Sequence, residues 1–484
     1  MPESSVDTSI ELAGALSTPL RFARGRPGAR CPTRTMAQNP RKSTQRERLL
    51  SGMVAATNRR GYAGATVSAV IAEAGVSRPT FYDYFADRDD CLQAAIEDVQ
   101  QELLAAITQE LAQRPANEAL AGAVAALVAY ASAEPAKAGF LLSESMAGGT
   151  RALDQRDRGI AKLAAAIERA QRGASADQRV ADLDPRVALG GVYRIIGTRL
   201  RRGEQAVSKL NDELLAWVAS YERAAGERRW QKLSPGPVPE RSPHLPDAPI
   251  HQAPALFPAG RPRLSEAEIA ENHRLRILYA TAQLAVEKGY PATTVADITR
   301  SASVDGRAFY RHFSDKQEAF TAVHELGFQQ VMDVTAKAFF SVEGWPQRSW
   351  EAGRALTQLL QENPLVARVG FVEAYAVGAS AVQRIEDSHT AFVFFLQEGL
   401  LQQPKDSVPP SRVAMEAIIA AVFETIYLQV RAGAESQLPA MLGQIEHLWL
   451  TPFLGVAEAD AFIERQQRAS KARKRSRAGA SDGG

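Results

Sequence analysis

A short aromatic unit occurs twice in this chain and constrains its fold more than any other feature. Residues 72–85 are AEAGVSRPTFYDYF and residues 300–313 are RSASVDGRAFYRHF, and both end in Phe-Tyr-x-x-Phe. Phe309 follows Phe81 by 228 residues, and the same offset aligns Gly61-Tyr62 with Gly289-Tyr290. Near the ends of the halves, VYRIIGTRLRRG (192–203) parallels VFETIYLQVRAG (422–433). The repeat therefore predicts one duplicated unit rather than two unrelated domains.

Each copy of the unit predicts a small module of three helices. In residues 45–85, Gly61 ends a first helix, Thr66 caps a second, and Gly75 supplies a tight turn that tolerates positive φ. Ser77 caps a third, short helix, which Phe81 and the Phe four residues later anchor to the other two. Two helices joined by a short turn form a helix-turn-helix, and its second helix can enter a major groove of DNA.

The segments GVSRPTFYDYFADR and SVDGRAFYRHFSDK resemble the turn, recognition helix and following helix start of the TetR family of transcriptional regulators. The resemblance extends over both halves and includes the closing LWLTPFLG at 448–455. It implies an all-α chain of two tandem TetR-like units. In each unit a three-helix head binds double-stranded DNA, and a larger helical domain encloses a small-molecule effector and dimerises through its last helices.

The chain of 484 residues is too long for one hydrophobic core, and composition marks its boundaries. Residues 231–262 contain nine prolines, which predict a stiff, extended, solvated linker. The expected parts are a disordered N-terminal tail (1–40), a first helix-turn-helix domain (41–90), a first effector domain (91–230), the Pro-rich linker (231–262), a second helix-turn-helix domain (263–318), a second effector domain (319–465) and a basic disordered tail (466–484). Met36 is an alternative start.

The resemblance also assigns DNA contacts residue by residue. Thr66 and Thr294 cap the second helix of each head and touch phosphate, Tyr82 and Tyr310 contact the backbone, and Arg88 and Lys316 meet phosphate at the next helix start. The residues expected to face bases are Ser77, Arg78, Pro79 and Thr80 in the first head and Asp305, Gly306, Arg307 and Ala308 in the second. Tyr84 and His312, which occupy matching positions, are also expected to contact DNA, although Tyr84 stands where the family usually has His.

The second head departs further from the family pattern. Ser303 replaces the turn glycine, Ala308 replaces the usual Thr, and Gly306 lies inside a short helix. The lead-in 41–60 carries six Lys or Arg against Glu47 alone, whereas 263–288 carries four basic and four acidic residues. However, the second recognition helix carries Arg307, Arg311 and His312 against only Arg78 in the first. Charge therefore does not decide which head dominates.

The sequence does not contain the motifs of other classes of function that we considered. The sequence has no Gly-rich phosphate loop, no G-x-S-x-G elbow and no H-E-x-x-H helix, so we expect no catalysis, cofactor or metal. Two cysteines fit a reducing cytoplasm, and we expect no apolar run of membrane-span length. The four residues Trp217, Trp345, Trp350 and Trp449 are expected in the core or at a dimer face. Glu144 and Glu373, each nine residues after a proline, are either surface charges or pocket residues.

Three architectures remain open. In the favoured one, the chain is a ligand-responsive repressor whose two heads form a covalent pseudo-dimer on an operator with unlike half-sites, with a hydrophobic or amphipathic effector. In the second, it is a ligand-binding or interaction scaffold in which one or both heads no longer bind DNA. In the third, two tandem chains form a homodimer with four heads.

Overall fold

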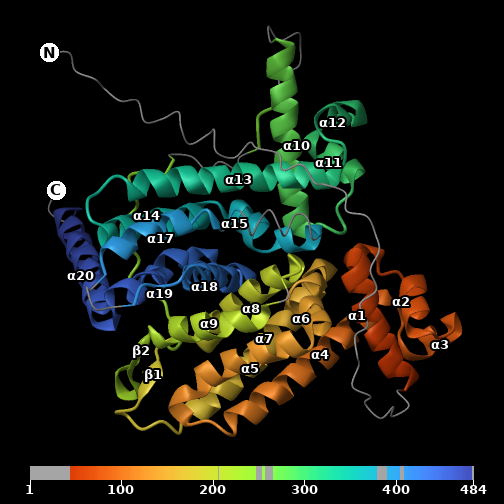
Figure 1. Ribbon diagram of the computed structural model, residues 1–484. Coiled ribbons are helices and arrows are strands. Elements are labelled where there is room, and N and C mark those ends of the chain that lie inside the picture. The colour runs from red at the N-terminus through yellow and green to blue at the C-terminus, as the bar shows by residue number, and fades with distance from the viewer. Residues whose placement is uncertain are drawn as a thin grey trace, which may run out of the picture. The chain divides into compact units, whose positions relative to one another are not determined.

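Side-chain caps begin the helices of the first head, as the sequence predicts. In the computed structural model (Figure 1), α1 (Gln45–Gly64) begins after Thr44, whose hydroxyl forms a capping box with Glu47. Thr66 caps α2 (Val67–Ala74), and Ser77 caps α3 (Arg78–Tyr84). Gly75 adopts φ 61° in the turn between them. Gly61, expected to end the first helix, adopts φ 67° and breaks it, but a last helical stretch continues to Gly64.

The structure describes residues 44–204, 206–246, 253–256, 265–378, 388, 390–403 and 408–481. All of them belong to one of the two compact units of the chain, Thr44–Gly484. The predicted N-terminal tail, 1–40, lies outside the described residues, as does Met36.

The second head repeats this construction. Ser265 caps α10 (Glu266–Lys288), Thr294 caps α11 (Val295–Ala302), and Asp305 caps α12 (Gly306–His312). The expected aromatic anchors are confirmed, because Phe81, Phe85, Phe309 and Phe313 are all buried.

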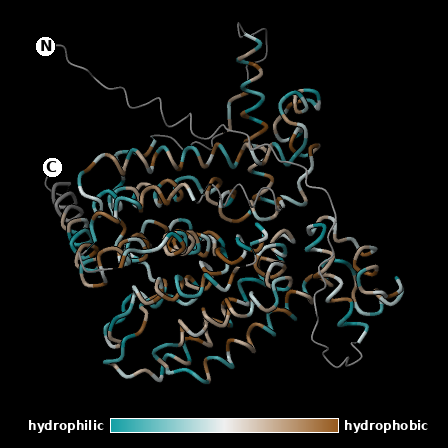
Figure 2. The backbone as a smooth tube through the Cα atoms, viewed as in Figure 1, coloured by the Kyte–Doolittle hydropathy of each residue, from teal (hydrophilic) through white to brown (hydrophobic). Residues whose placement is uncertain are grey.

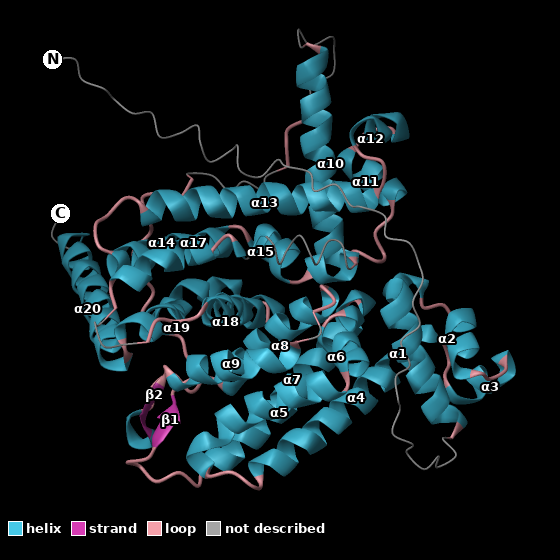
Figure 3. Ribbon diagram, viewed as in Figure 1, coloured by secondary structure: helices cyan, strands magenta, loops and turns pink. Residues whose placement is uncertain are grey.

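Helices make up most of the two larger domains (Figure 3). The first domain contains α4 (Arg88–Leu111), α5 (Ala119–Ala133), α6 (Pro135–Leu142), α7 (Thr150–Gln171), α8 (Pro185–Arg201) and α9 (Leu210–Ala219), with 3-10 turns at Ala116–Glu118, Glu144–Gly148, Val207–Lys209 and Ala225–Glu227. The second contains α13 (Lys316–Phe339), α14 (Trp345–Glu362), α15 (Pro364–Phe371), α17 (Val393–Gln397), α18 (Arg412–Arg431), α19 (Leu442–Leu454) and α20 (Val456–Ser481), with 3-10 turns at Glu373–Val377, Glu398–Leu401 and Glu435–Met441. A two-stranded antiparallel ribbon, β1 (Arg179–Ala181) with β2 (Glu222–Ala224), pairs Val180 with Arg223.

The halves meet mainly where α8 packs against α18, two helices that the repeat makes equivalent (Figure 1). Small residues permit the close approach: a Cβ on Gly191 would lie 3.2 Å from the backbone nitrogen of Ala421. Most of the buried residues of α18 are apolar, and α18 forms part of the hydrophobic centre in Figure 2.

Two helical segments are long and apolar enough to cross a membrane by composition, Ala116–Ala133 and Arg412–Arg431. The expectation that no run reaches this length was therefore wrong. In Arg412–Arg431, 83% of the window is buried inside the protein, as in a core helix, because it pairs with the other half.

The described start of the Pro-rich linker is docked rather than solvated. The backbone nitrogen of Gly236 donates to the carbonyl of Ala440 at 2.7 Å, and that of Ser242 donates to Oε1 of Gln358 at 2.7 Å. Arg241 pairs with Glu362 at 2.9 Å. These contacts fix residues 231–246 against the second half, because a proline-rich backbone leaves its remaining N–H groups free to bind neighbouring acceptors.

The C-terminal segment also differs from the expectation. Residues 466–481, predicted as the start of a disordered basic tail, continue α20. This helix contacts the first half through Asp460, which pairs with Arg223, and Glu464, which pairs with Arg229. Ion pairs and the buried side chains of Ala459, Phe462 and Ile463 therefore fix the start of this helix, and residues 466–481 extend it.

Candidate DNA-binding heads, effector cavity and interface

The outer face of α3 presents most of the predicted contacts of the first head to solvent. Ser77, Arg78 and Pro79 are exposed, and so are Tyr82 (50%) and Tyr84 (44%). Thr80 is partly buried, and its hydroxyl lies 2.7 Å from that of Ser77. An arginine and two phenols on one exposed helix face can donate hydrogen bonds to phosphates or base edges.

In the second head, α12 presents a different set. Gly306 and Arg307 are exposed, as is Tyr310 (62%). Asp305 is exposed too, but its carboxylate accepts from the backbone nitrogen of Ala308 at 2.7 Å and so caps the helix. Ala308 itself is only 5% exposed, and this burial does not fit the expectation that it faces bases.

Two further side chains modify the expected surface of α12. His312 is partly buried, and burial together with the neighbouring Arg311 lowers the pKa of its imidazole. Arg311 is exposed on the same helix, although the family pattern did not include it among the contacts.

The two predicted phosphate-binding cations are held by the protein itself. Nη2 of Arg88 donates to the hydroxyl of Tyr62 at 2.8 Å, and its guanidinium lies 4.1 Å from the centre of the Tyr62 ring. Nζ of Lys316 donates to the carbonyl oxygens of Tyr290, Pro291 and Thr293 at 2.9–3.2 Å. Both cations thus brace the loop before the second helix of their head. Similarly, the Thr66 and Thr294 hydroxyls accept from the backbone as N-caps.

The turn of the second head carries backbone strain. Ser303 has φ 49°, and it is the one non-glycine residue with positive φ among those the structure describes. Nη2 of Arg276 donates to the carbonyl of Ser303 at 2.8 Å and also to that of Ala302, so an arginine from α10 stabilises this turn.

The two matched glutamates differ in their surroundings. Glu373 is buried and accepts from the backbone nitrogen of Tyr290 at 3.2 Å, which ties the second domain to its head. Glu144 is partly buried and lines a polar hollow in the first half with Ser143 and Arg201. Burial raises the pKa of both carboxyl groups.

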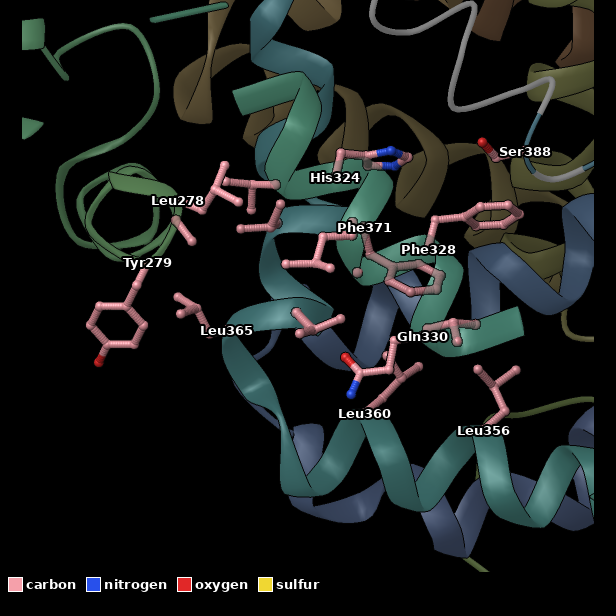
Figure 4. A pocket seen from close by; sticks show the side chains of 18 of the residues that line it. Leu278, Tyr279, His324, Phe328, Gln330, Leu356, Leu360, Leu365, Phe371 and Ser388 are labelled. Carbon is pink, nitrogen blue, oxygen red and sulfur yellow. The ribbon is translucent and has the colours of Figure 1, made fainter. Parts of the chain in front are cut away.

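The second half encloses an apolar cavity of about 370 Å³ between α10, α13, α14 and α15 (Figure 4). Its lining includes Leu278, Phe328 and Leu360, and the imidazole of His324 is one of few polar groups there. Nothing in the sequence marked His324, or the glycine three residues after it, as part of a cavity wall. Among the described residues, no cluster of three or more His, Cys, Asp or Glu could hold a metal ion.

The tryptophans that were expected in the core or at a dimer face do not line this cavity. Trp217, Trp345 and Trp350 are buried, and Trp449 is partly buried against the core. The indole nitrogen of Trp217 donates to Tyr221, whose hydroxyl donates to the carbonyl of Leu448 in the other half.

A buried ion triad lies at the centre of the α8–α18 interface. Both carboxylate oxygens of Glu424 accept from Nη2 of Arg156, at 3.0 and 2.9 Å, and Oε2 also accepts from Nε and Nη2 of Arg194 at 3.3 and 3.2 Å. The side chain of Glu424 is 0% exposed, and those of Arg156 and Arg194 are 6% and 14% exposed. The two guanidinium groups lower the pKa of Glu424 despite its burial.

The internal repeat explains why this triad requires one first half and one second half. Arg194 and Glu424 occupy the same position of the two aligned segments, VYR at 192–194 and VFE at 422–424. A pair of two first halves would bring arginines together there, and a pair of two second halves would bring glutamates together. Only unlike halves neutralise each other at this position.

Comparison with known proteins agrees with this architecture. The model of the bacterial regulatory proteins of the TetR family matches residues 49–95 and 277–323, which coincide with the two heads. No curated protein matches the chain.

Solved structures similar to the chain are TetR-type regulators. The regulator FadR from Bacillus subtilis, in complex with stearoyl-CoA, is 18% identical over 36% of this chain and 97% of its own, with a TM-score of 0.31. A putative TetR-family regulator from Syntrophomonas wolfei is 16% identical over 41% of this chain and 95% of its own (TM-score 0.28). A TetR-family regulator from Marinobacter aquaeolei is 19% identical over 36% and 96% (TM-score 0.29). Two matches to the family's model, each on a three-helix head that a helical domain follows, show that this chain carries the TetR-type DNA-binding head twice, as a tandem TetR-like duplication.

Proposed function

We propose that this chain is a ligand-responsive transcriptional repressor that acts as a covalent pseudo-dimer on an operator with two unlike half-sites. The observation that carries the proposal is the pairing of α8 with α18 through a triad that only unlike halves can form. A TetR-type regulator needs two heads because one recognition helix contacts too few base pairs, and here one chain supplies both.

The exposed faces of the recognition helices support unlike half-sites. The first head offers Arg78 with the phenols of Tyr82 and Tyr84, and the second offers Arg307 and Arg311 with Tyr310. Since arginine prefers guanine edges and tyrosine hydroxyls prefer phosphate, different placement of these groups on α3 and α12 favours different sequences.

Selection from random duplex DNA by the intact chain, followed by footprinting, tests this proposal. We expect one enriched site with two different half-sites and one chain bound per site by light scattering. Tyr82→Phe and Tyr310→Phe should each weaken operator binding, by about 1 kcal/mol for each lost hydrogen bond. A palindromic site bound by two chains would overturn the proposal and favour the homodimer with four heads.

A second candidate function is an interaction scaffold whose second head no longer binds DNA. The observations that favour it are the strained turn at Ser303 and the carboxylate of Asp305 at the start of α12, where it would repel phosphate. In that case Tyr310→Phe leaves DNA affinity unchanged, and the salt dependence of binding reports phosphate contacts from the first head alone.

A further inference from the structure

We propose that the two halves differ in function, and that only the second half takes an uncharged, apolar small molecule as effector. This inference rests on the proposed function and specifies where and what the regulator senses. It follows from a comparison of positions that the repeat makes equivalent.

The cavity of the second half has the size and lining of a ligand site. Its volume of about 370 Å³ falls in the range of roughly 300–1,000 Å³ that is usual for sites of small organic molecules. Figure 4 shows Leu278, Phe328, Leu356, Leu360 and Leu365 around it, and the polar side chains that line it are uncharged or weakly basic: Tyr279, His324, Gln330 and Ser388. None of the described lining residues carries an acidic or a strongly basic side chain.

In the first half, larger side chains fill the matching space. With the offsets of the repeat, Val99 corresponds to Gly327, Phe140 to Val369, and Leu141 to Gly370. Val99, Phe140 and Leu141 are buried in the core of the first half. Gly327, Val369 and Gly370 all line the cavity of the second half. These three reductions in side-chain volume open space in the second half, whereas the first half has a separate hollow of about 870 Å³ whose lining includes the charged residues Glu144, Arg201 and Glu204.

The side chains at the edge of the cavity also differ from those at the matching positions of the first half. In the first half, Nζ of Lys137 on α6 donates to Oε2 of Glu102 on α4 at 2.7 Å, and the hydroxyl of Tyr130 donates to the same oxygen at 3.2 Å. The positions that correspond to Glu102 and Lys137 are Gln330 and Val366, which line the cavity. The first half therefore has a charged pair at positions where the second half has neutral side chains that line its cavity.

The chemistry of the lining selects an uncharged ligand. Burial of a carboxylate, sulfonate or phosphate without a partner costs several kcal/mol, roughly 2–7 even for a neutral polar group. Burial also lowers the pKa of His324 to about 4, so that its imidazole is neutral at pH 7 and cannot serve as a counter-charge. A neutral imidazole can still bind one hydroxyl or carbonyl of an otherwise apolar molecule.

The cavity also touches the element that carries the second head. Leu275, Leu278, Tyr279 and Ala282 on its wall belong to α10, and α10 packs directly against α11 and α12. Leu278 is at the same time part of the buried core of the head. A ligand that prefers one position of α10 therefore shifts the head, as regulation requires.

Titration of the intact chain with the neutral dye N-phenyl-1-naphthylamine and with its 8-sulfonate tests the proposal by fluorescence. We expect one site per chain for the neutral dye and at least about ten-fold weaker binding of the sulfonate there, or about 1.4 kcal/mol. Gly370→Leu and Gly327→Val restore first-half side chains and should each weaken binding at least about ten-fold. A Cβ on Gly370 meets no atom within 4 Å, so the first variant is expected to fold.

Gly139→Leu is the matched control, because Gly139 lies on the equivalent helix α6, lines the polar hollow of the first half, and also has no atom within 4 Å of an added Cβ. It should leave dye binding unchanged. The inference is overturned if the wild-type chain binds no neutral dye, if Gly370→Leu and Gly327→Val bind it as the wild type does, if Gly139→Leu removes binding, or if the sulfonate binds equally well.

Operator binding, measured by mobility shift on the same variants, separates this inference from the proposed function. We expect Gly370→Leu to bind operator as the wild type does but to lose release by the neutral dye. If no variant binds DNA while dye binding follows the expected pattern, the regulator proposal fails and the division of the halves stands.

Discussion

Replacement of Glu424 by glutamine removes the carboxylate that the second half contributes to the triad, and it leaves two buried arginines of the first half, of which only Arg156 keeps a carboxylate partner, Asp157 at 3.0 Å. The carboxylate is 0% exposed and its partners are 6% and 14% exposed, so water cannot replace the lost charge. Removal of one partner from a buried ion pair costs about 3–5 kcal/mol. Glutamine retains one acceptor oxygen, which places the expected loss near the lower end, about 3 kcal/mol.

The assay is urea unfolding at pH 7, followed by the fluorescence of Trp217 and Trp230, which lie close to the interface. Glu118→Gln is the matched control, since Glu118 forms an exposed pair with Arg114 at 3.3 Å and its loss should cost less than about 1 kcal/mol. Equal midpoints for Glu424→Gln and Glu118→Gln would refute the role of the triad in pairing the halves.

Two further measurements test the physical cause. Leucine at all three triad positions should recover most of the loss, because an apolar replacement leaves no unpaired charge. Because the folded pKa of Glu424 lies below its unfolded value, the stabilisation is present above the unfolded pKa of about 4.3. It is lost as the pH falls through the folded pKa, so the difference between wild type and Glu424→Gln should shrink in acid.

Three further predictions each follow from a single observation. Ser303→Gly relieves the positive φ and should stabilise the second head by about 1 kcal/mol in thermal unfolding. Gly75→Ser at the matching turn should destabilise the first head. If neither substitution changes stability, the turn at Ser303 is not strained. Burial raises the pKa of Glu446 to about 8, so wild-type stability should fall as the pH rises from about 4.5 to 8, and Glu446→Gln should abolish that slope in urea titrations. Gly190→Ala places a Cβ against the triad carboxylate and should lower the urea midpoint, while Gly139→Ala, where nothing lies within 4 Å, should raise it slightly.

Local signals made the heads predictable. Thr66, Ser77 and Thr294 cap the helices that the sequence assigned to them, and Phe81 and Phe309 are buried as their helical spacing requires. Such features depend on a few neighbouring residues, so a single sequence contains them. The burial of Ala308 was missed because the orientation of a seven-residue helix depends on what it packs against.

Features that join distant residues were not predictable in the same way. The aligned segments show that Arg194 stands where the second half has Glu424, but only the packing of α8 on α18 brings these side chains together. Likewise, Gly327 and Gly370 are 43 positions apart in sequence numbering and mark a cavity only once α13 lies beside α15. These substitutions are visible in the sequence, but only the fold shows which of the substituted residues lie close together.

The covalent fusion of the two halves and the opposite charges of Arg194 and Glu424 restrict the pairing of the halves in different ways. Fusion raises the effective concentration of the second half to about millimolar, but it leaves two chains free to exchange halves. The triad excludes like pairs, yet an exchanged pair of unlike halves from two chains satisfies it equally well. The docked stretch 231–246 adds a further restriction, because Gly236, Ser242 and Arg241 bind the second half directly. An exchanged pair would have to satisfy these contacts as well, which supports the proposed closure within one chain.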